Sequence, residues 1–344
     1  MAANYWESTQ RKHWQFTKDQ LATMRQKLED EDPQLVHMFP LPQLRHLNIY
    51  FNQQINRLAK RLGVRQQAMA TAQMYLKRFY TCVEIRRTNP YLVLATAVYL
   101  ACKMEECPQH IRLVVQEARS LWPADFIGLD TSKLGECEFF LISEMNSQLI
   151  VHQPYRALTM LQGEFALSPE EVALAWSVIN DAFMTDLPLL YPPHVIACTA
   201  VLLAVVLRPT GNTASGSQGG GSTPTNSQAG LQAAAAALSQ ARAAAGGNGP
   251  PTPMGGSTPA SSQGSQGGPD GSQSVKRAAP STPDARVGKV QRFAAWLGES
   301  GIDIEAMVDS TQELIAFYEC HEQYNDKLTR EQINRFVKAR GLDK

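Results

Sequence analysis

A cluster of charged side chains closes the apolar segment YLACKMEEC, residues 99–107. A lysine at the end of a helix is stabilised by the helix macrodipole, whereas a glutamate there costs about 0.3 to 1 kcal/mol. Lys103 is therefore favourable, but local helix stability does not account for Glu105 and Glu106. Two explanations remain open. Either the glutamates belong to a solvated turn after the helix, or the charged end, together with Met104, contacts a partner protein with acidic and basic groups.

A carboxylate and two phenylalanines lie on one side of a second segment, TSKLGECEFFLISEMN, residues 131–146. At 100° per residue, the apolar positions of this expected helix fall within about 80° of one another. Those positions are Leu134, Cys137, Leu141 and Met145. Glu136 and Phe139 point to the opposite side, with Phe140 on the flank. This arrangement suits a protein interface with an apolar centre, but it also suits a helix that its own domain covers on two sides.

Motifs for catalysis are absent from the sequence. It contains no HExxH, GxSxG, P-loop or dinucleotide fingerprint, and its seven histidines are scattered singly. The cysteines never form a CxxC pair, which indicates reduced core thiols in an intracellular protein. They are Cys82, Cys102, Cys107, Cys137, Cys198 and Cys320. We therefore expect a protein that is not an enzyme and that has no cofactor, metal or small-molecule ligand.

The charge balance argues against nucleic acid and anionic lipid as partners. Lysine plus arginine and aspartate plus glutamate both total 32, which gives a formal net charge of +0. The strongest apolar run, VIACTAVLLAVVL at residues 195–207, is shorter than the roughly 20 residues that a membrane span needs. The N-terminus has no apolar stretch typical of a secretory signal. We predict no direct nucleic-acid contact and no membrane insertion.

Helical periodicity dominates the chain outside one segment. Apolar residues from Leu44 to Leu62 recur at intervals of three and four, which predicts an amphipathic helix. The segment YLVLATAVYLAC, after Pro90, is apolar on all sides, as expected of a helix surrounded by others. Three further segments, RQQAMATAQMYLKRFY, HIRLVVQEARSLW and TSKLGECEFFLISEMN, complete five helices with no strand signal. The sequence predicts an all-α fold.

The core helix recurs further along the chain. Pro90 aligns with Pro193 at an offset of 193 − 90 = 103, and the residues after each proline match at the same offset. Ser168, Pro169 and Glu171 supply a capping box and an N1 proline for the helix before the second copy. We expect two tandem five-helix units. RFAAWLGES and IDIEAMVDSTQELIAFYECHEQY complete the second, and a last helix is expected to be capped through Thr329 and Gln332.

The expected domains are a helical N-terminal segment at residues 1–40, a first unit at 41–150 and a second at 151–210 that resumes at 288–344 with a C-terminal helix. Residues 211–287 are rich in Gly, Ser, Pro and Ala and have few large apolar side chains, so we predict a disordered insertion. Its four threonines that precede prolines are candidate phosphorylation sites. They are Thr223, Thr252, Thr258 and Thr282.

The chain resembles the cyclin family. Two five-helix units with apolar central helices resemble twin cyclin boxes, and the phrases NYWEST, ATAQMYLKRFY, ACKMEE, ECEFF and NDAFMTDLPLLYPPHVIA resemble the C-type cyclin of the Mediator kinase module. The resemblance covers residues 1 to about 208 closely and the part after 288 loosely. It implies a nuclear, non-catalytic subunit that binds and activates a cyclin-dependent kinase in RNA polymerase II transcription.

The resemblance also implies functional residues. It places Lys103 and Glu136 at the kinase contact, and we add Met104, Phe139 and Phe140 as the apolar contribution. We expect Glu105 or Glu106 to face arginines of the kinase activation loop.

A second partner surface, for other subunits of the Mediator kinase module, is expected at the aromatic N-terminal segment with Tyr5 and Trp6. Asp186 and Tyr191, in the loop before the second core helix, are further candidate contacts for a partner. Only the resemblance supports this expectation. The alternative function is a cyclin-fold general transcription factor that binds DNA directly, but such a protein should carry a basic stripe.

Overall fold

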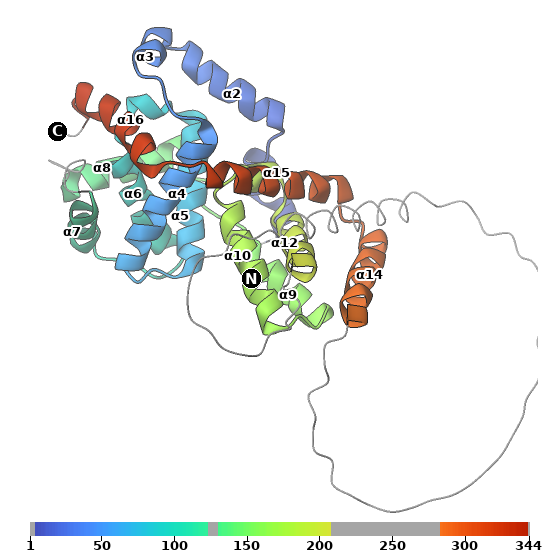
Figure 1. Cartoon of the computed structure of the whole chain (residues 1–344). Coiled ribbons are helices and arrows are strands. Elements are labelled where there is room, and N and C mark those ends of the chain that lie inside the picture. Colours follow the sequence, from blue (N-terminus) through green and yellow to red (C-terminus); the bar gives the residue numbers. More distant parts are fainter. Residues whose placement is uncertain (1–3, 123–129, 208–282, 343–344) are drawn as a thin grey trace, which may run out of the picture.

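The computed structural model describes residues 4–122, 130–207 and 283–342, which form helices joined by turns and contain no strand (Figure 1). The predicted all-α class is therefore confirmed. Among these residues, no helix combines the length and the apolar character that a membrane span requires. The four candidate phosphorylation sites of the insertion lie outside the described residues.

A first bundle forms around one fully packed helix, α6. Its helices are α4 (Leu44–Arg61), α5 (Gln66–Cys82), α6 (Pro90–Met104), α7 (Ile111–Leu121) and α8 (Thr131–Glu144), with a short turn η2 (Ile85–Arg87) before α6. The Asn89 side chain accepts hydrogen bonds from the backbone N–H groups of Tyr91 and Leu92, and Pro90 occupies N1. Eleven of the fifteen residues of α6 are buried, as the sequence predicts for a core helix.

A second bundle repeats this plan around α12. Its helices are α9 (Tyr155–Glu164), α10 (Pro169–Ala182), the short α11 (Leu187–Leu190), α12 (Pro193–Leu207), α14 (Pro283–Ser300) and α15 (Ile304–Glu322). The helices α6 and α12 both begin at the aligned prolines and both span fifteen residues, which confirms the repeat. The capping box of Ser168 and Glu171 is also present. Helix α14 begins at Pro283, inside the range that we assigned to the insertion.

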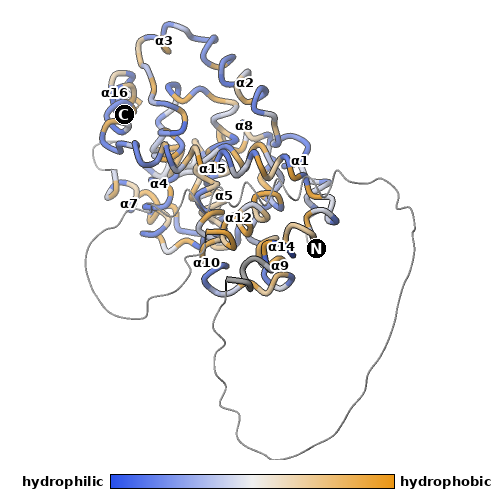
Figure 2. Tube along the Cα trace, turned by 45° about the vertical axis from the view of Figure 1, so that its right-hand side comes forward, coloured by the Kyte–Doolittle hydropathy of each residue, from blue (hydrophilic) through white to orange (hydrophobic). Residues whose placement is uncertain are grey.

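The N-terminal segment comprises η1 (Tyr5–Glu7), α1 (Thr9–His13), α2 (Lys18–Asp30) and α3 (Pro33–Met38). Figure 1 shows α2 and α3 at the margin of the molecule, and Figure 2 shows that the tube of α2 is largely hydrophilic. Leu21 is the one residue of α2 that is buried. This helix is therefore attached to the rest mainly by polar contacts.

The last helix, α16 (Asp326–Ala339), corrects one expectation. Its N-cap is Asn325, which accepts a hydrogen bond from the Leu328 backbone N–H, and Thr329 lies inside the helix. Asparagine ranks above threonine as an N-cap, which explains the earlier start. The buried residues Ile333 and Phe336 of α16 join the core of the first bundle, against α4, although α16 follows the second bundle in sequence.

Hydrogen bonds of two buried side chains, Arg78 and Gln10, hold the segment where the chain passes from one bundle to the other. The guanidinium of Arg78, on α5, is fully buried and donates to the backbone carbonyls of Gln148 (2.6 Å) and Ile150 (3.2 Å). Gln10, on α1, accepts a hydrogen bond from the His152 backbone N–H at 2.7 Å. Helix α1 and the linker residues 148–152 therefore form one hydrogen-bonded layer over α5.

Candidate protein-binding surface

The charged residues after α6 belong to the turn that ends it. The helix stops at Met104, and Glu105 is its C-cap. The backbone N–H of Glu106 donates to the Lys103 carbonyl (3.3 Å), and that of Cys107 donates to the Cys102 carbonyl (2.9 Å). This pair of bonds is the Schellman motif, in which residue C′ adopts the left-handed conformation. Glu106 occupies C′ with a φ of 54°. The two glutamates therefore lie in the turn that ends the helix, and this position leaves a role in partner contact open.

Lys103 reaches a carboxylate that the sequence analysis missed. Its ammonium forms an ion pair with Glu138 of α8 and lies 4.7 Å from the centroid of the Tyr99 ring. The Lys103 side chain keeps 40% of its accessible surface, whereas that of Glu138 keeps 11%. Glu138 follows Leu134 by four residues, which places a carboxylate beside the core face of α8. A carboxylate in that position needs a cation, and this signal could have identified the need for a cation although not which residue supplies it.

The two glutamates of the turn face different ways. Glu105 is half-buried, and its carboxylate accepts hydrogen bonds from Thr71 Oγ1 at 2.6 Å and Gln153 Nε2 at 3.4 Å. Its role within the described residues is therefore to join the end of α6 to α5 and to the segment before α9. Glu106 is exposed. Of the two, Glu106 is the one that a partner can reach directly.

Exposed apolar side chains lie at the end of α6 and on α8, the helix that packs against it. Phe139 of α8 is 75% exposed, the highest value among the large apolar residues that the structure describes, and Met104 and Phe140 are each 42% exposed. The Phe140 ring packs edge-on against the buried Phe79 at 5.3 Å, so its position is fixed. Glu136, on the same helix, is exposed. Helices α6 and α8 pack against each other.

We call the exposed residues at the C-terminal end of α6 and in the middle of α8 the α6/α8 surface. Its members are Lys103, Met104, Glu106, Glu136, Phe139 and Phe140. The structure brings together, on neighbouring helices, the residues that the sequence singled out on separate segments. Lys103 and Glu136 remain accessible, which is what contact with a partner requires. An apolar centre flanked by charges is typical of protein interfaces.

The aromatic N-terminal residues form a second exposed group. Trp6 is 53% exposed, its ring lies 5.4 Å from that of His194, and the Arg11 guanidinium lies 5.4 Å from the Trp6 centroid. The Tyr5 hydroxyl donates to Gln15 at 2.6 Å, and its ring packs edge-on against His152 at 5.6 Å. Tyr5 is therefore held within the fold, while Trp6 presents an aromatic face to solvent.

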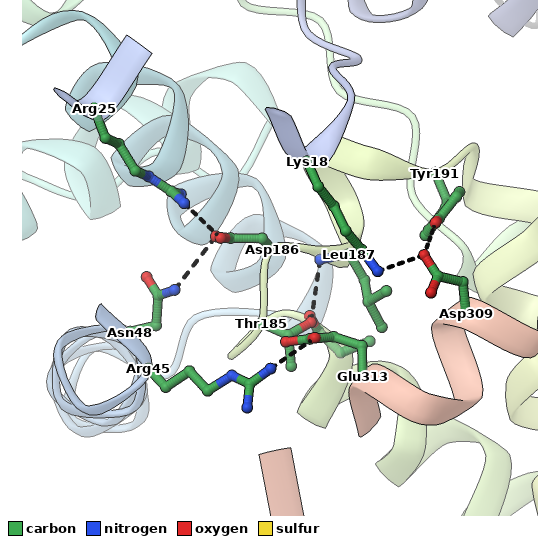
Figure 3. Close-up of polar contacts among 11 residues, drawn as sticks. Lys18, Arg25, Arg45, Asn48, Thr185, Asp186, Leu187, Tyr191, Asp309 and Glu313 are labelled. Carbon is green, nitrogen blue, oxygen red and sulfur yellow. Dashed lines mark hydrogen bonds and ion pairs between the residues drawn. The ribbon is translucent and has the colours of Figure 1, made fainter. Parts of the chain in front are cut away.

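Asp186 lies where α2, α4 and the loop before α12 meet (Figure 3). Its carboxylate accepts hydrogen bonds from Arg25 at 2.8 Å and from Asn48 at 3.3 Å. Burial alone would raise the pKa of Asp186, but the positive charges of Lys77 and Arg25 outweigh burial and hold that pKa below its ordinary value. Asp186 is therefore a charged, internally bonded group.

Tyr191 is bonded in a similar way. Its hydroxyl donates to Asp309 of α15, and Lys18 of α2 forms an ion pair with the same carboxylate at 2.6 Å (Figure 3). Burial first and the adjacent Asp309 second raise the pKa of the Tyr191 hydroxyl. The polar atoms of Asp186 and Tyr191 thus tie α2 and α15 to the loop, and neither side chain projects alone toward a partner.

A cavity of about 250 Å³ lies beneath α2, between α4 and α5. Lys77 lines it, and its ammonium is buried without a hydrogen-bond partner. Burial lowers the pKa of Lys77 to about 8. Over the part of the chain that the structure describes, no group of three or more His, Cys, Asp and Glu residues is arranged to hold a metal ion.

Comparison with known proteins agrees with this architecture. The family model "Cyclin, N-terminal domain" matches residues 21–150. The RNA polymerase II holoenzyme cyclin-like subunit of Neurospora crassa is 66% identical, and that of Emericella nidulans is 50% identical, each over the whole of both chains.

Solved structures support the fold as well. A chain in the structure of the CAK complex of Chaetomium thermophilum bound to ATP-gamma-S matches 96% of this chain and 88% of its own length. The TM-score is 0.51 and the sequence identity is 17%, so this likeness concerns the fold alone.

Proposed function

This chain belongs to the cyclin family of RNA polymerase II holoenzyme cyclin-like subunits, and from that membership we propose that it binds and activates a cyclin-dependent kinase through the α6/α8 surface. In this role it is a regulatory subunit without catalytic residues of its own. We further propose that the complex belongs to the Mediator kinase module and acts in the nucleus. The names of the relatives, which place them in the RNA polymerase II holoenzyme, support this assignment.

The observation that carries the proposal is the exposure of Phe139 beside a fixed Phe140. A large aromatic side chain that is three-quarters exposed adds little to its own core, and its place next to Phe140, which is also exposed, supports a contact site here. Neighbouring Lys103 and Glu136 supply one charge of each sign. The pattern fits a partner surface with an apolar pocket flanked by charges, and residues of this type dominate binding energy when they are buried at an interface.

The free energies involved distinguish the role of the charged residues of this surface from that of the apolar ones. A kinase is active when the glutamate of its C-helix pairs with the active-site lysine and its activation loop is ordered. Shifting such an equilibrium from 1:99 to 99:1 takes about 5.5 kcal/mol of differential binding, whereas an exposed ion pair supplies about 0 to 1 kcal/mol. Lys103 already pairs with Glu138. The charges therefore orient the complex, and Met104, Phe139 and Phe140 supply most of the affinity.

The different surroundings of the two glutamates in the turn support different roles for them. Glu105 is hydrogen-bonded to Thr71 and Gln153. We therefore assign to Glu106, which is exposed, the contact with arginines of the kinase activation loop. For other subunits of the module we assign Trp6 as the contact, because the polar groups of Asp186 and Tyr191 are bonded within the fold.

A binding measurement with two matched variants tests the proposal. Lys103→Glu is not a suitable test variant, because it would place a second carboxylate against Glu138 within the fold. Phe139→Ala removes an exposed side chain from α8, and Met160→Ala removes one that is 71% exposed from α9. We expect Phe139→Ala to weaken binding of the kinase catalytic subunit by at least about thirtyfold, the effect of a hot-spot residue. Met160→Ala should bind like the parent chain. Equal binding by both variants would refute the assignment of the surface.

A further inference from the structure

The turn that ends α6 brings two cysteines together. Cys102 is the third residue from the end of the helix, and Cys107 is the first residue after the left-handed Glu106. Their backbones are joined by the 2.9 Å hydrogen bond from the Cys107 N–H to the Cys102 carbonyl. In a Schellman motif, the side chains at these two positions commonly contact each other. Burial first and the nearby Cys107 second raise the pKa of the Cys102 thiol to about 12.

We propose that Cys102 and Cys107 form a reversible disulfide when the protein meets a hydroperoxide. A disulfide requires Cα atoms about 4.4 to 6.8 Å apart with converging side chains. The direct backbone hydrogen bond holds Cys102 and Cys107 at the two ends of one tight turn, in which the side chains at these positions converge. Cys82 differs from this pair, because its polar neighbour is a hydroxyl and not a second thiol: Thr81 Oγ1 lies 3.8 Å from the Cys82 sulfur. Transient disulfides of this kind are the ones that reducing compartments permit.

The two thiols have different exposure, and this fixes the order of the steps. Cys107 is half-buried, whereas Cys102 is fully buried. The Cys107 thiolate attacks the terminal peroxide oxygen and breaks the O–O bond, which gives a sulfenic acid and a hydroxide or alkoxide that is protonated to water or to an alcohol. The Cys102 sulfur then loses its proton and displaces the hydroxyl of the sulfenic acid as water. The two thiols lose two electrons, which reduce the peroxide.

Formation of the bond would change the turn. The two sulfur atoms must approach to about 2.05 Å, which draws Cys107 toward α6 and shifts Glu106 with it. Because Glu106 belongs to the α6/α8 surface, oxidation should weaken binding of the kinase. This second part of the inference rests on the proposed function, whereas the disulfide itself does not.

Mass spectrometry of the full chain tests the disulfide. Trypsin cleaves after Lys103 and so separates the two cysteines into the peptides Thr88–Lys103 and Met104–Arg112. After treatment with hydrogen peroxide and blocking of free thiols with N-ethylmaleimide, we expect these peptides to be joined. Dithiothreitol should separate them. In Cys102→Ser, which removes the second sulfur, Cys107 should accumulate as sulfinic acid. Cys107 that becomes sulfinic acid in the parent chain, or that links to another cysteine, would overturn the proposal.

Kinase binding tests the consequence. We expect the oxidised chain to bind the kinase at least about fivefold more weakly than the reduced chain, the lower end of typical coupling between sites. Dithiothreitol should restore binding, and Cys107→Ser should show no response to peroxide. A joined peptide pair with unchanged binding would overturn the regulatory part alone. A reduced chain that fails to bind the kinase would instead contradict the proposed function.

Discussion

Glu106 carries a local conformational cost at the surface that we assign to partner binding. Its φ of 54° lies in the left-handed region, which costs a residue other than glycine about 1 to 2 kcal/mol. Helices that end in this motif usually place glycine at this position. Strained positions of this kind cluster at binding sites, where the rest of the fold holds them in place. The cost and the exposure of Glu106 together favour a functional role over a structural one.

Replacing Glu106 with glycine should separate stability from binding. We expect Glu106→Gly to raise the free energy of unfolding by about 1 kcal/mol, because glycine adopts the left-handed conformation without strain. The same change should weaken kinase binding, because the carboxylate is lost. Urea denaturation and binding titration measure the two effects. Glu105→Gly is the control, since Glu105 has a φ of −96° and hydrogen bonds to lose, and it should lower stability. A destabilised Glu106→Gly would show that the turn is unstrained.

At the scale of helices, sequence signals within one turn predict where a helix begins, but they do not predict how separate helices pack. The starts of α6 and α10 follow from Asn89, Pro90 and the Ser168 capping box, which act within one turn of the helix. The pairing of Lys103 with Glu138 and the inward orientation of Glu105 depend on how separate helices pack. No pattern within one helix determines that packing. The same reason explains why the docking of α16 on the first bundle was not predicted.

Helix α2 shows how an element of low hydrophobicity is held in place. Its buried residue Leu21 is supplemented by ion pairs from Lys18 to Asp309 and from Arg25 to Asp186. Beneath it lies Lys77, whose ammonium is buried without a hydrogen-bond partner. Burial lowers the pKa of Lys77 from 10.5 to about 8. A buried cation of this kind makes stability depend on pH in the alkaline range.

Lys77 should make the protein more stable as the pH rises through the alkaline range. Between about pH 8 and pH 10.5 the unfolded chain keeps a proton on Lys77 that the folded chain has released. Stability contributed by this group therefore rises with pH across the window. The difference in unfolding free energy, parent chain minus Lys77→Met, should rise by up to about 3 kcal/mol over this range. Lys60→Met, at an exposed position of α4, should show no such rise. A flat difference for Lys77→Met would mean that Lys77 is hydrated in solution.

The whole molecule is held together by segments that cross between the bundles. Helix α15 of the second bundle also packs against α4 of the first, and Arg45 of α4 forms an ion pair with Glu313 of α15 at 2.9 Å (Figures 1 and 3). Helix α16 then returns to the first core. With the hydrogen-bonded layer of Gln10 and the linker residues 148–152, these contacts predict that both bundles unfold together.

Arg78 is the residue on which this coupling most depends. Arg78→Met should roughly keep the side-chain volume but remove the donor of the Gln148 and Ile150 carbonyls. We expect the unfolding free energy to fall by about 3 kcal/mol. Weaker coupling should also split the single transition in two. Tryptophan fluorescence would report each transition separately in variants that keep tryptophans in one bundle at a time. Those of the first bundle are Trp14 and Trp122, and those of the second are Trp176 and Trp296.

Arg61→Met is the control. It removes an exposed ion pair with Glu117 at 3.6 Å and should lower the unfolding free energy by less than about 1 kcal/mol. If Arg78→Met unfolded in one transition at the parent midpoint, the bundles would be joined mainly by α15 and α16.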